Sequence, residues 1–165
     1  MINTVERGFI WDGRQKLMLY SLISILIFGA DSKIKHEVER NLEPGSEKSA
    51  CGGRLLIRKH HNKGIMLNLM DGHQKLTAAV SAGLTVFLVL HGIETFADRD
   101  RSKGEKLGFA FLIGGALSNT LDRITRGYVV DYVSFRVKWK KFQNIVFNIS
   151  DFFIMAGACM TALFR

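Results

Sequence analysis

Four stretches of this chain are almost free of charged residues, and polar segments separate them. They cover residues 17–30, 76–93, 107–121 and 152–164. A helix needs about 20 apolar residues to cross a bilayer, and only the second stretch approaches that length by itself. The other three reach it if one carboxylate near the end of each is included, and these carboxylates are Asp31, Asp122 and Asp151. The pattern therefore predicts an all-α membrane bundle of four transmembrane helices.

Composition separates this prediction from a soluble alternative. The formal net charge of +8 and the pI near 9.7 would also suit a soluble protein that binds nucleic acid. A soluble helix shows a polar stripe, however, and residues 76–93 contain no polar residues other than Thr, Ser and one His. We therefore expect membrane lipids rather than nucleic acid as partners, with basic loops facing anionic headgroups. Without a repeat or a linker, residues 1–165 are expected to form one domain.

Two segments outside the apolar stretches carry strand signals. Residues 54–60 and 65–70 flank the tetrapeptide His61–Gly64, which is typical of a hairpin turn. Residues 129–139 alternate between an apolar face and a face that becomes basic, and Asp131 is the one acid on the apolar face. The sequence thus predicts a small β-containing portion beside the bundle.

The order of the spans brings several carboxylates to one membrane face. With alternating directions, the end of the first span, the start of the second, the end of the third and the start of the fourth share a side. The carboxylates at or near that side are Asp31, Asp71, Asp122, Asp131 and Asp151. The Lys and Arg counts of the loops do not decide which side faces the cytoplasm.

Asp131 and Asp151 are the strongest candidates for chemistry. An ionised carboxylate in apolar surroundings costs several kcal/mol unless it is paired, so such positions are rarely kept for packing. Two neighbouring carboxyl groups share one proton, which is the arrangement of an aspartic protease. The alternative is structural, because Asn148 and Ser150 place helix-capping chemistry beside Asp151. From the residues alone, both interpretations of Asp151 stay open.

The remaining polar residues have plainer interpretations. The adjacent Asp122 and Arg123 favour an orienting role, and the amides of Asn119 and Asn148 join helices or bind a substrate backbone. A further group of residues, His60, His61, Asp71 and His73, fits no standard zinc spacing, and we expect no metal. The two cysteines, Cys51 and Cys159, stand in unlike surroundings and are not expected to pair.

Three segments together resemble the lipoprotein signal peptidases, also called signal peptidase II. They read GGALSNTLDR from Gly114, GYVVDY from Gly127 and FNISD from Phe147. The resemblance implies a four-span membrane aspartic protease of the bacterial inner membrane that works as a monomer and without a cofactor. Its substrate would be a lipid-modified prolipoprotein, and the active site and the β-containing portion would lie near the extracytoplasmic face.

The resemblance also assigns roles to individual residues. It makes Asp131 and Asp151 the catalytic pair. The residues that it implies as supporting or substrate-contacting are Asp31, Lys35, Asn62, Gly64, Asn119, Asp122, Arg123 and Asn148. Ser118, Ser32 and Leu67 depart from the family pattern in regions that would contact substrate. A diverged paralog with another membrane substrate, or a proton-linked carrier that is not an enzyme, are the alternatives.

Overall fold

The computed structural model describes residues 13–64 and 73–165. Within these ranges the chain forms four long helices, which are α1 (Gly13–Asn41), α2 (Gln74–Ala97), α3 (Lys103–Arg126) and α5 (Ile149–Leu163). Three strands form one antiparallel sheet in the order β1 (Glu47–Ala50), β2 (Leu55–Asn62) and β3 (Val129–Phe135). A 3-10 turn, η1 (Cys51–Gly53), joins β1 to β2, and the short helix α4 (Lys140–Gln143) follows β3.

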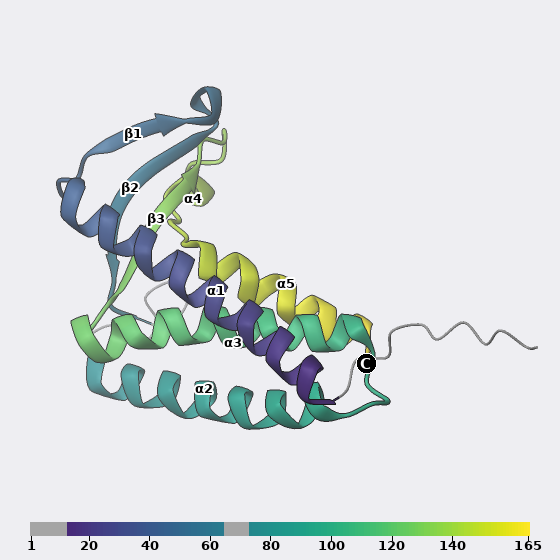
Figure 1. Ribbon diagram of the computed structural model, residues 1–165. Helices are drawn as coiled ribbons and strands as arrows, with labels where there is room; N and C mark the ends of the chain where they lie inside the picture. The colour runs from purple at the N-terminus through teal and green to yellow at the C-terminus, as the bar shows by residue number, and fades with distance from the viewer. Residues whose placement is uncertain (1–12, 65–72) are drawn as a thin grey trace, which may run out of the picture.

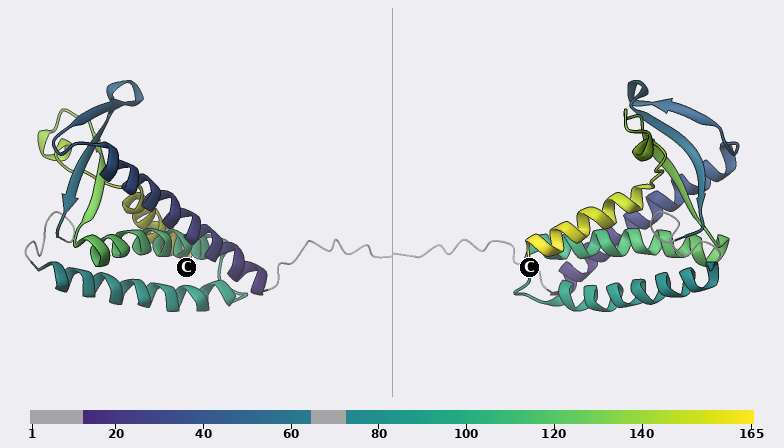
Figure 2. Two further views of the ribbon diagram at one scale, coloured as in Figure 1. Left: turned by 60° about the vertical axis from the view of Figure 1, so that its left-hand side comes forward. Right: turned by 180° about the vertical axis from the view of Figure 1, so that it is seen from behind.

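Helix α3 is the centre of the bundle, because it packs against each of the other three long helices. Figure 1 shows α2 running beside α3, while α1 and α5 cross on the other side of α3. The sheet stands at one end of the bundle, over the last turns of α1 and the start of α5, and the C-terminus lies at the other end (Figures 1 and 2). The elements that carry the predicted site residues therefore meet where the sheet joins the bundle.

Small residues allow α3 to lie close to its neighbours. A Cβ atom on Gly114 would come within 2.7 Å of the Ser24 carbonyl oxygen of α1. A Cβ atom on Gly115 would come equally close to the carbonyl oxygen of Ser150, at 2.7 Å. Close backbone approach of this kind is characteristic of helix packing in lipid. The two glycines thus bring α1 and α5 against α3 just below the sheet.

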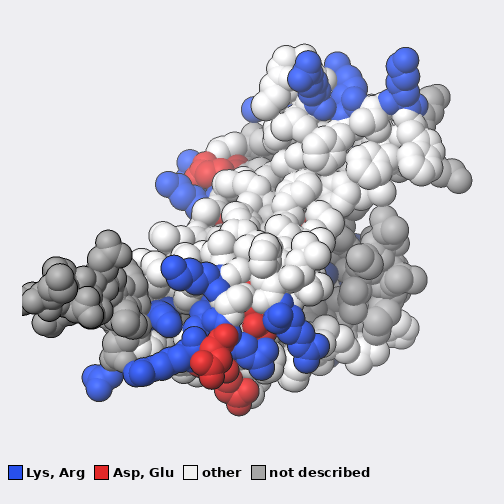
Figure 3. All heavy atoms as spheres, turned by 90° about the vertical axis from the view of Figure 1, so that its right-hand side faces the viewer, with Lys and Arg blue, Asp and Glu red and all other residues white. Residues whose placement is uncertain are grey.

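The prediction of apolar spans is confirmed in part. Among the described residues, α1 with 29 residues and α2 with 24 are long and apolar enough to cross a membrane, while the apolar α5 has only 15. Central helix α3 contains charged and polar residues, several of them buried, and this composition lowers its hydropathy. Charged side chains gather at the α2–α3 turn, in the lower part of Figure 3, and a few Lys and Arg side chains project at the top of the view, at the end of the molecule that carries the sheet.

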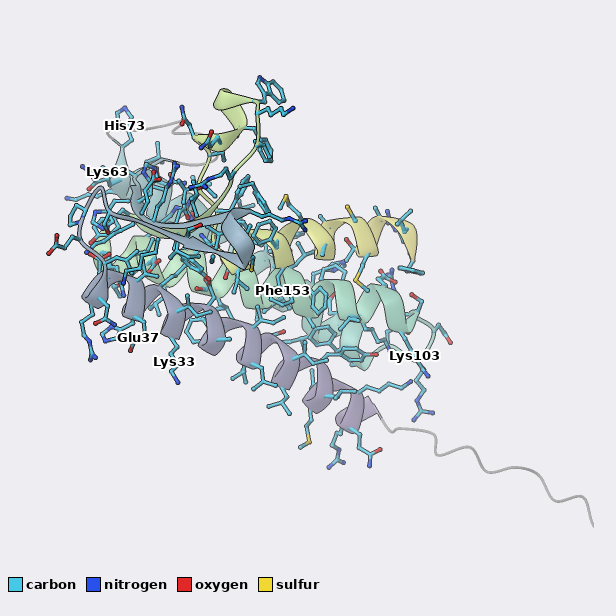
Figure 4. The ribbon with its side chains drawn as sticks, turned by 90° about the horizontal axis from the view of Figure 1, so that it is seen from above. Lys33, Glu37, Lys63, His73, Lys103 and Phe153 are labelled. Carbon is cyan, nitrogen blue, oxygen red and sulfur yellow. The ribbon has the colours of Figure 1, made fainter. Side chains whose placement is uncertain are left out.

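Helix α1 is longer than the sequence pattern predicted. The apolar stretch ends at Ala30, and Asp31 alone was expected to extend the span, but the helix continues to Asn41. Asp31, Lys35 and Val38 are all buried at helical spacing, so the polar segment has its own inward face. Lys33 and Glu37 occupy the outward face and point away from the bundle (Figure 4).

The predicted hairpin turn at His61–Gly64 was also wrong. His61 and Asn62 are the last residues of β2, and β2 forms its hairpin with β1, which precedes it. The turn between them is η1, where Gly52 and Gly53 have φ values of 65° and 86°. These angles suit glycine, which explains the position of the turn. The second predicted arm, residues 65–70, and Asp71 lie outside the described residues.

Strand β3 ends at Phe135 rather than at Trp139, and it is buried on both faces. The predicted apolar face, with Val129 and Asp131, is buried. On the other face Val130 and Tyr132 pack against Val38 of α1. Both faces of β3 are therefore buried over its first half.

Candidate active site

The predicted site residues converge at the junction of the sheet and the bundle. They come from α1, the end of β2, the last turns of α3, β3 and the start of α5. The structure joins them through hydrogen bonds, ion pairs and electrostatic interactions: Asp31, Lys35, Asn62, Gly64, Asn119, Asp122, Arg123, Asp131, Asn148 and Asp151. Span order alone predicted this gathering of carboxylates, and the geometry agrees for the four that are described.

Asp131 is held on β3 by two side-chain amides. Its Oδ1 accepts a hydrogen bond from Nδ2 of Asn148 at 2.7 Å, and its Oδ2 accepts one from Nδ2 of Asn62 at 3.0 Å. The Asn62 amide is oriented in turn, since its Oδ1 accepts from the backbone N–H of Gly64 at 3.2 Å. Asp131 is 2% exposed. Both of its bonded partners are neutral donors.

Asp151 lies in the first turn of α5 and forms a capping box with Asn148. The backbone N–H of Asp151 donates to Asn148 Oδ1 at 2.9 Å, and Asp151 Oδ2 accepts from the backbone N–H of Asn148 at 3.0 Å. The capping interpretation of Asp151 is therefore correct. It leaves the other oxygen, Oδ1, which accepts from Nδ2 of Asn119 at 3.0 Å. Asn148 thus touches both carboxyl groups and fixes one relative to the other.

The electrostatics of Asp131 favour a shared proton. Burial, and after it the charge of Asp151, raise the pKa of Asp131 to about 7, against the opposing effect of the two amide hydrogen bonds. Within the described part of the chain, neither carboxylate of the pair forms a salt bridge. Arg123 lies close enough to interact electrostatically with both. Asp131 can therefore carry a proton near neutral pH, which general acid catalysis requires.

Asp31 and Lys35 form a fully buried ion pair beneath the dyad. Lys35 Nζ lies 2.9 Å from Asp31 Oδ2, and the two side chains are 1% and 0% exposed. Lys35 also donates to Oδ1 of Asn119 at 2.7 Å. This bond turns the Nδ2 of Asn119 toward Asp151. The Asp31–Lys35 pair is thus separated from Asp151 by one residue, and it orients the amide that binds Asp151.

Asp122 and Arg123 are adjacent in the sequence, but their side chains bind different partners. Asp122 lies 3.3 Å from Lys35 and 3.2 Å from Arg126, and it accepts the backbone N–H of Val130 at 3.1 Å. It therefore ties α3 to the strand that carries Asp131. Arg123 instead donates to the backbone oxygens of Asn119 and Gly64, at 3.4 and 3.3 Å.

Three residues of the cluster were not assigned to it from the sequence. The hydroxyls of Ser118 and Ser150 each donate to Asp31 Oδ2 at 2.6 Å, and the hydroxyl of Tyr132 donates to Asp31 Oδ1 at 2.8 Å. Ser118, one of the departures from the family pattern, also accepts from Lys35 at 3.1 Å. The available signal was a lone hydroxyl inside an apolar segment, which needs a partner when buried.

The other candidates lie outside this cluster. His61 does not belong to a metal group, and its Nε2 lies 3.0 Å from a carboxylate oxygen of Glu39. No three His, Cys, Asp or Glu side chains of residues 13–64 and 73–165 are grouped as metal ligands are. Cys51 and Cys159 are both exposed and unpaired.

Two acidic side chains that share an amide partner, at the end of a bundle with apolar helices, form an arrangement typical of a membrane aspartic peptidase. The fold is similar to that of a bacterial membrane enzyme solved by the in meso method, with a TM-score of 0.74 over 87% of this chain and 84% of that one, at 21% identity.

The relatives identify the family. The chain is 34% identical to the lipoprotein signal peptidase of Clostridioides difficile, over 89% of this chain and 96% of the relative. It is also 34% identical to that of Mesorhizobium japonicum, over 86% and 81%. Residues 23–165 match the family model described as signal peptidase (SPase) II. The chain therefore belongs to the signal peptidase II family of aspartic peptidases.

Proposed function

We propose that Asp131 and Asp151 are the catalytic dyad of an endopeptidase that removes the signal peptide from prolipoproteins. The cut falls on the amino side of a diacylglyceryl-modified cysteine. One observation carries the assignment of the dyad. The buried carboxyl group of Asp131 and the partly buried one of Asp151 interact electrostatically and are bound by amides, with no bonded cation among the described residues to keep both ionised.

The mechanism uses the two protonation states of one pair. The ionised carboxylate takes a proton from a water molecule, and the water oxygen attacks the scissile carbonyl. The protonated carboxyl group donates to the carbonyl oxygen as it gains negative charge. Return of a proton to the amide nitrogen releases the signal peptide and restores the pair. Asn148 keeps the two carboxyl groups in register through these steps, because it bonds to both.

Arg123 and Asn62 are the residues best placed to contact the substrate near the dyad. Arg123 interacts electrostatically with both aspartates, and its Nε is buried without a partner among the described residues. A peptide carbonyl beside the dyad would supply the missing acceptor. Asn62, at the end of β2, donates to Asp131, so it would lie beside the scissile bond of a bound substrate.

We also propose a placement in the membrane that fits this geometry. All four long helices cross the bilayer of a bacterial inner membrane, with the sheet on the extracytoplasmic side. The dyad then lies near that interface, where a lipid-bearing cysteine keeps its acyl chains in the bilayer while its peptide bond reaches the carboxyl groups. Exposed apolar side chains on α2, such as Leu84, Phe87 and Leu90, face lipid in this placement.

The direct test is cleavage of a diacylglyceryl-modified precursor by the purified protein. The intact protein should release the signal peptide, whereas Asp131→Asn and Asp151→Asn should each lower kcat by about 10²–10⁴-fold. The double variant should be no worse than either single one, since the two residues act as a unit.

Asp100→Asn is the matched control, because Asp100 is an exposed carboxylate at the opposite end of the bundle. It should leave cleavage unchanged. Cleavage that persists in both dyad variants would refute the assignment of the dyad. An intact protein that cleaves no diacylglyceryl precursor would point to the paralog or to the carrier.

A further inference from the structure

Strand β2 contains a one-residue bulge shortly before Asn62. In its pairing with β3, Ile57 lies opposite Val133 and His60 lies opposite Asp131. Three steps along β2 therefore match two steps along β3, and residues 58 and 59 together face one residue of β3. An extra residue in one strand turns the side chains that follow it to the opposite face of the sheet.

The bulge decides which side chain of β2 reaches Asp131. With the bulge, Asn62 lies opposite Val129, which places it on the same face as Asp131 and diagonal to it. Its amide then donates to Asp131 at 3.0 Å. In a regular strand, His61 would stand opposite Val129 and Asn62 would point to the other face. The hydrogen bond to Asp131 thus depends on a register that is set three residues earlier.

The bulge is fastened to the end of α1 by a lysine. Lys59 Nζ donates to the backbone oxygens of Glu39 at 2.8 Å and Leu42 at 3.1 Å, and its side chain is 11% exposed. Carbonyls in the last turn of a helix lack helical partners and favour a cation. His61 points the same way, since its ring contacts the Glu39 carboxylate at 3.0 Å and stacks on Tyr128. Both side chains hold β2 in the bulged register.

We propose that Lys59 is a positioning residue for the dyad, which fixes the bulge of β2 to α1 so that Asn62 faces Asp131. Its effect on cleavage rests on the proposed function, but its effect on register does not. Without the hydrogen bonds of Lys59 to α1, the bulge can be lost. Residue 59 then pairs with Asp131, and the side chain of Asn62 turns to the opposite face of the sheet. Lys59 touches neither carboxyl group, so it acts through Asn62 alone.

Steady-state cleavage by Lys59→Ala is the first measurement. We expect kcat to fall about 10-fold or more, as for the loss of a hydrogen bond to a charged group, with KM little changed. In an Asn62→Ala background the same substitution should cost nothing further in kcat. Lys48→Ala is the control, since Lys48 is exposed on the neighbouring strand. A Lys59→Ala protein with wild-type kcat would overturn the proposal.

Deleting residue 59 separates positioning from general stability. The deletion removes the fastening and the bulge together, so two steps along β2 match two along β3 and Asn62 keeps its place opposite Val129. We expect the deletion variant to cleave faster than Lys59→Ala even where it unfolds at a lower temperature. A deletion that is as inactive as Lys59→Ala would show that Lys59 supports stability only, and would overturn the proposal.

The register can also be measured without any substrate. In a protein with Cys51→Ser and Cys159→Ser, the substitutions Glu39→Cys and His61→Cys place two thiols that a short bismaleimide can bridge. Bridging should be efficient with Lys59 and fall several-fold with Lys59→Ala, as residue 61 turns away from α1. Equal bridging refutes the fastening whatever the activity. If the double-cysteine protein with Lys59 bridges efficiently and loses bridging with Lys59→Ala, while the unsubstituted protein cleaves no precursor, the proposed function is refuted and the contact between Lys59 and α1 is supported.

Discussion

Two buried carboxylates of the same cluster, Asp31 and Asp131, have opposite kinds of partner. Asp31 accepts from three hydroxyls and lies 2.9 Å from the ammonium of Lys35. Asp131 accepts from two neutral amides and interacts with a second carboxyl group, that of Asp151. The first carboxylate has a cation as a bonded partner, whereas the hydrogen-bonded partners of the second among the described residues are neutral amides.

This difference in partners distinguishes Asp31, which has a structural role, from Asp131, for which we propose a catalytic role. A buried ion pair with all its hydrogen bonds made is a fixed support. A buried acid that is bound by amides and faces another acid can take up or release a proton near neutral pH. The two parts are connected, because Lys35 bonds one end of the Asn119 amide and Asp151 accepts from the other end. The neutralised pair thus orients a donor of the dyad without transferring protons itself.

The largest effect on stability is expected from Lys35→Met. Asp31 would keep its three hydroxyl donors but lose its only bonded cation among the described residues. Breaking a buried pair from one side costs about 3–5 kcal/mol, because the remaining charge is uncompensated. The free energy of unfolding, measured by denaturant titration in detergent, should fall by that amount.

Two further proteins sharpen this test. Lys33→Met is the control, since Lys33 lies on the outward face of the same helix (Figure 4) and should leave stability unchanged. Adding Asp31→Asn to Lys35→Met should restore most of the loss, because the unpaired charge is removed. Were Lys33→Met equally harmful, the difference between the two carboxylates would not rest on charge neutralisation.

The next largest effect is expected from the pH dependence of Asp131→Asn. With its pKa raised to about 7, Asp131 holds a proton in the folded state at pH values where the unfolded chain has released it. Wild-type stability should therefore fall as the pH rises from about 4 to 7. The shift corresponds to at most about 4 kcal/mol. At pH 4 the variant should be about 1 kcal/mol less stable than the wild type, because an amide cannot accept from both Asn62 and Asn148.

Thermal unfolding of both proteins at pH 4, 6 and 8 measures this effect. The variant should show a flat profile that crosses the falling profile of the wild type, and it should be the more stable protein at pH 8. Parallel profiles for the two proteins would mean that Asp131 is not the group whose proton is held, and the contrast with Asp31 would then lose its electrostatic basis.

Smaller effects are expected from substitutions of Asn148, and they distinguish its role as the cap of α5 from its role as a donor to Asp131. Asn148→Ala removes both the cap of α5 and the amide donor of Asp131, so it should cost about 1–2 kcal/mol of stability and also lower kcat. Asn148→Ser keeps a capping oxygen but has no amide to reach Asp131. It should therefore retain most of the stability and still cleave about 10-fold more slowly or worse. Equal kcat for Asn148→Ser and the wild type would show that the amide does not serve the dyad.

The sequence predicted the parts of this arrangement that follow from local pattern. Apolar stretches gave the four long helices, and span order gathered the carboxylates, because both depend on periodicity and chain direction. The register of β2 could not be predicted from the sequence, since the bulge depends on contacts between β2 and α1, which are distant from each other in the chain. The donors to Asp31 were also missed, because a hydroxyl such as Ser150 shows no partner until the helices pack.

The smallest expected effect is that of Tyr132→Phe, which tests whether the supporting role of Asp31 is independent of the catalytic role of Asp131. Asp31 loses one hydroxyl donor but keeps Ser118, Ser150 and Lys35, and the backbone N–H of Ile149 loses an acceptor. We expect a loss of about 1 kcal/mol in unfolding free energy and a kcat within about 3-fold of the wild type. A tenfold loss of kcat with so small a loss of stability would contradict this independence of the two roles, because a hydrogen-bond donor to Asp31 would then affect catalysis by Asp131 and Asp151 directly.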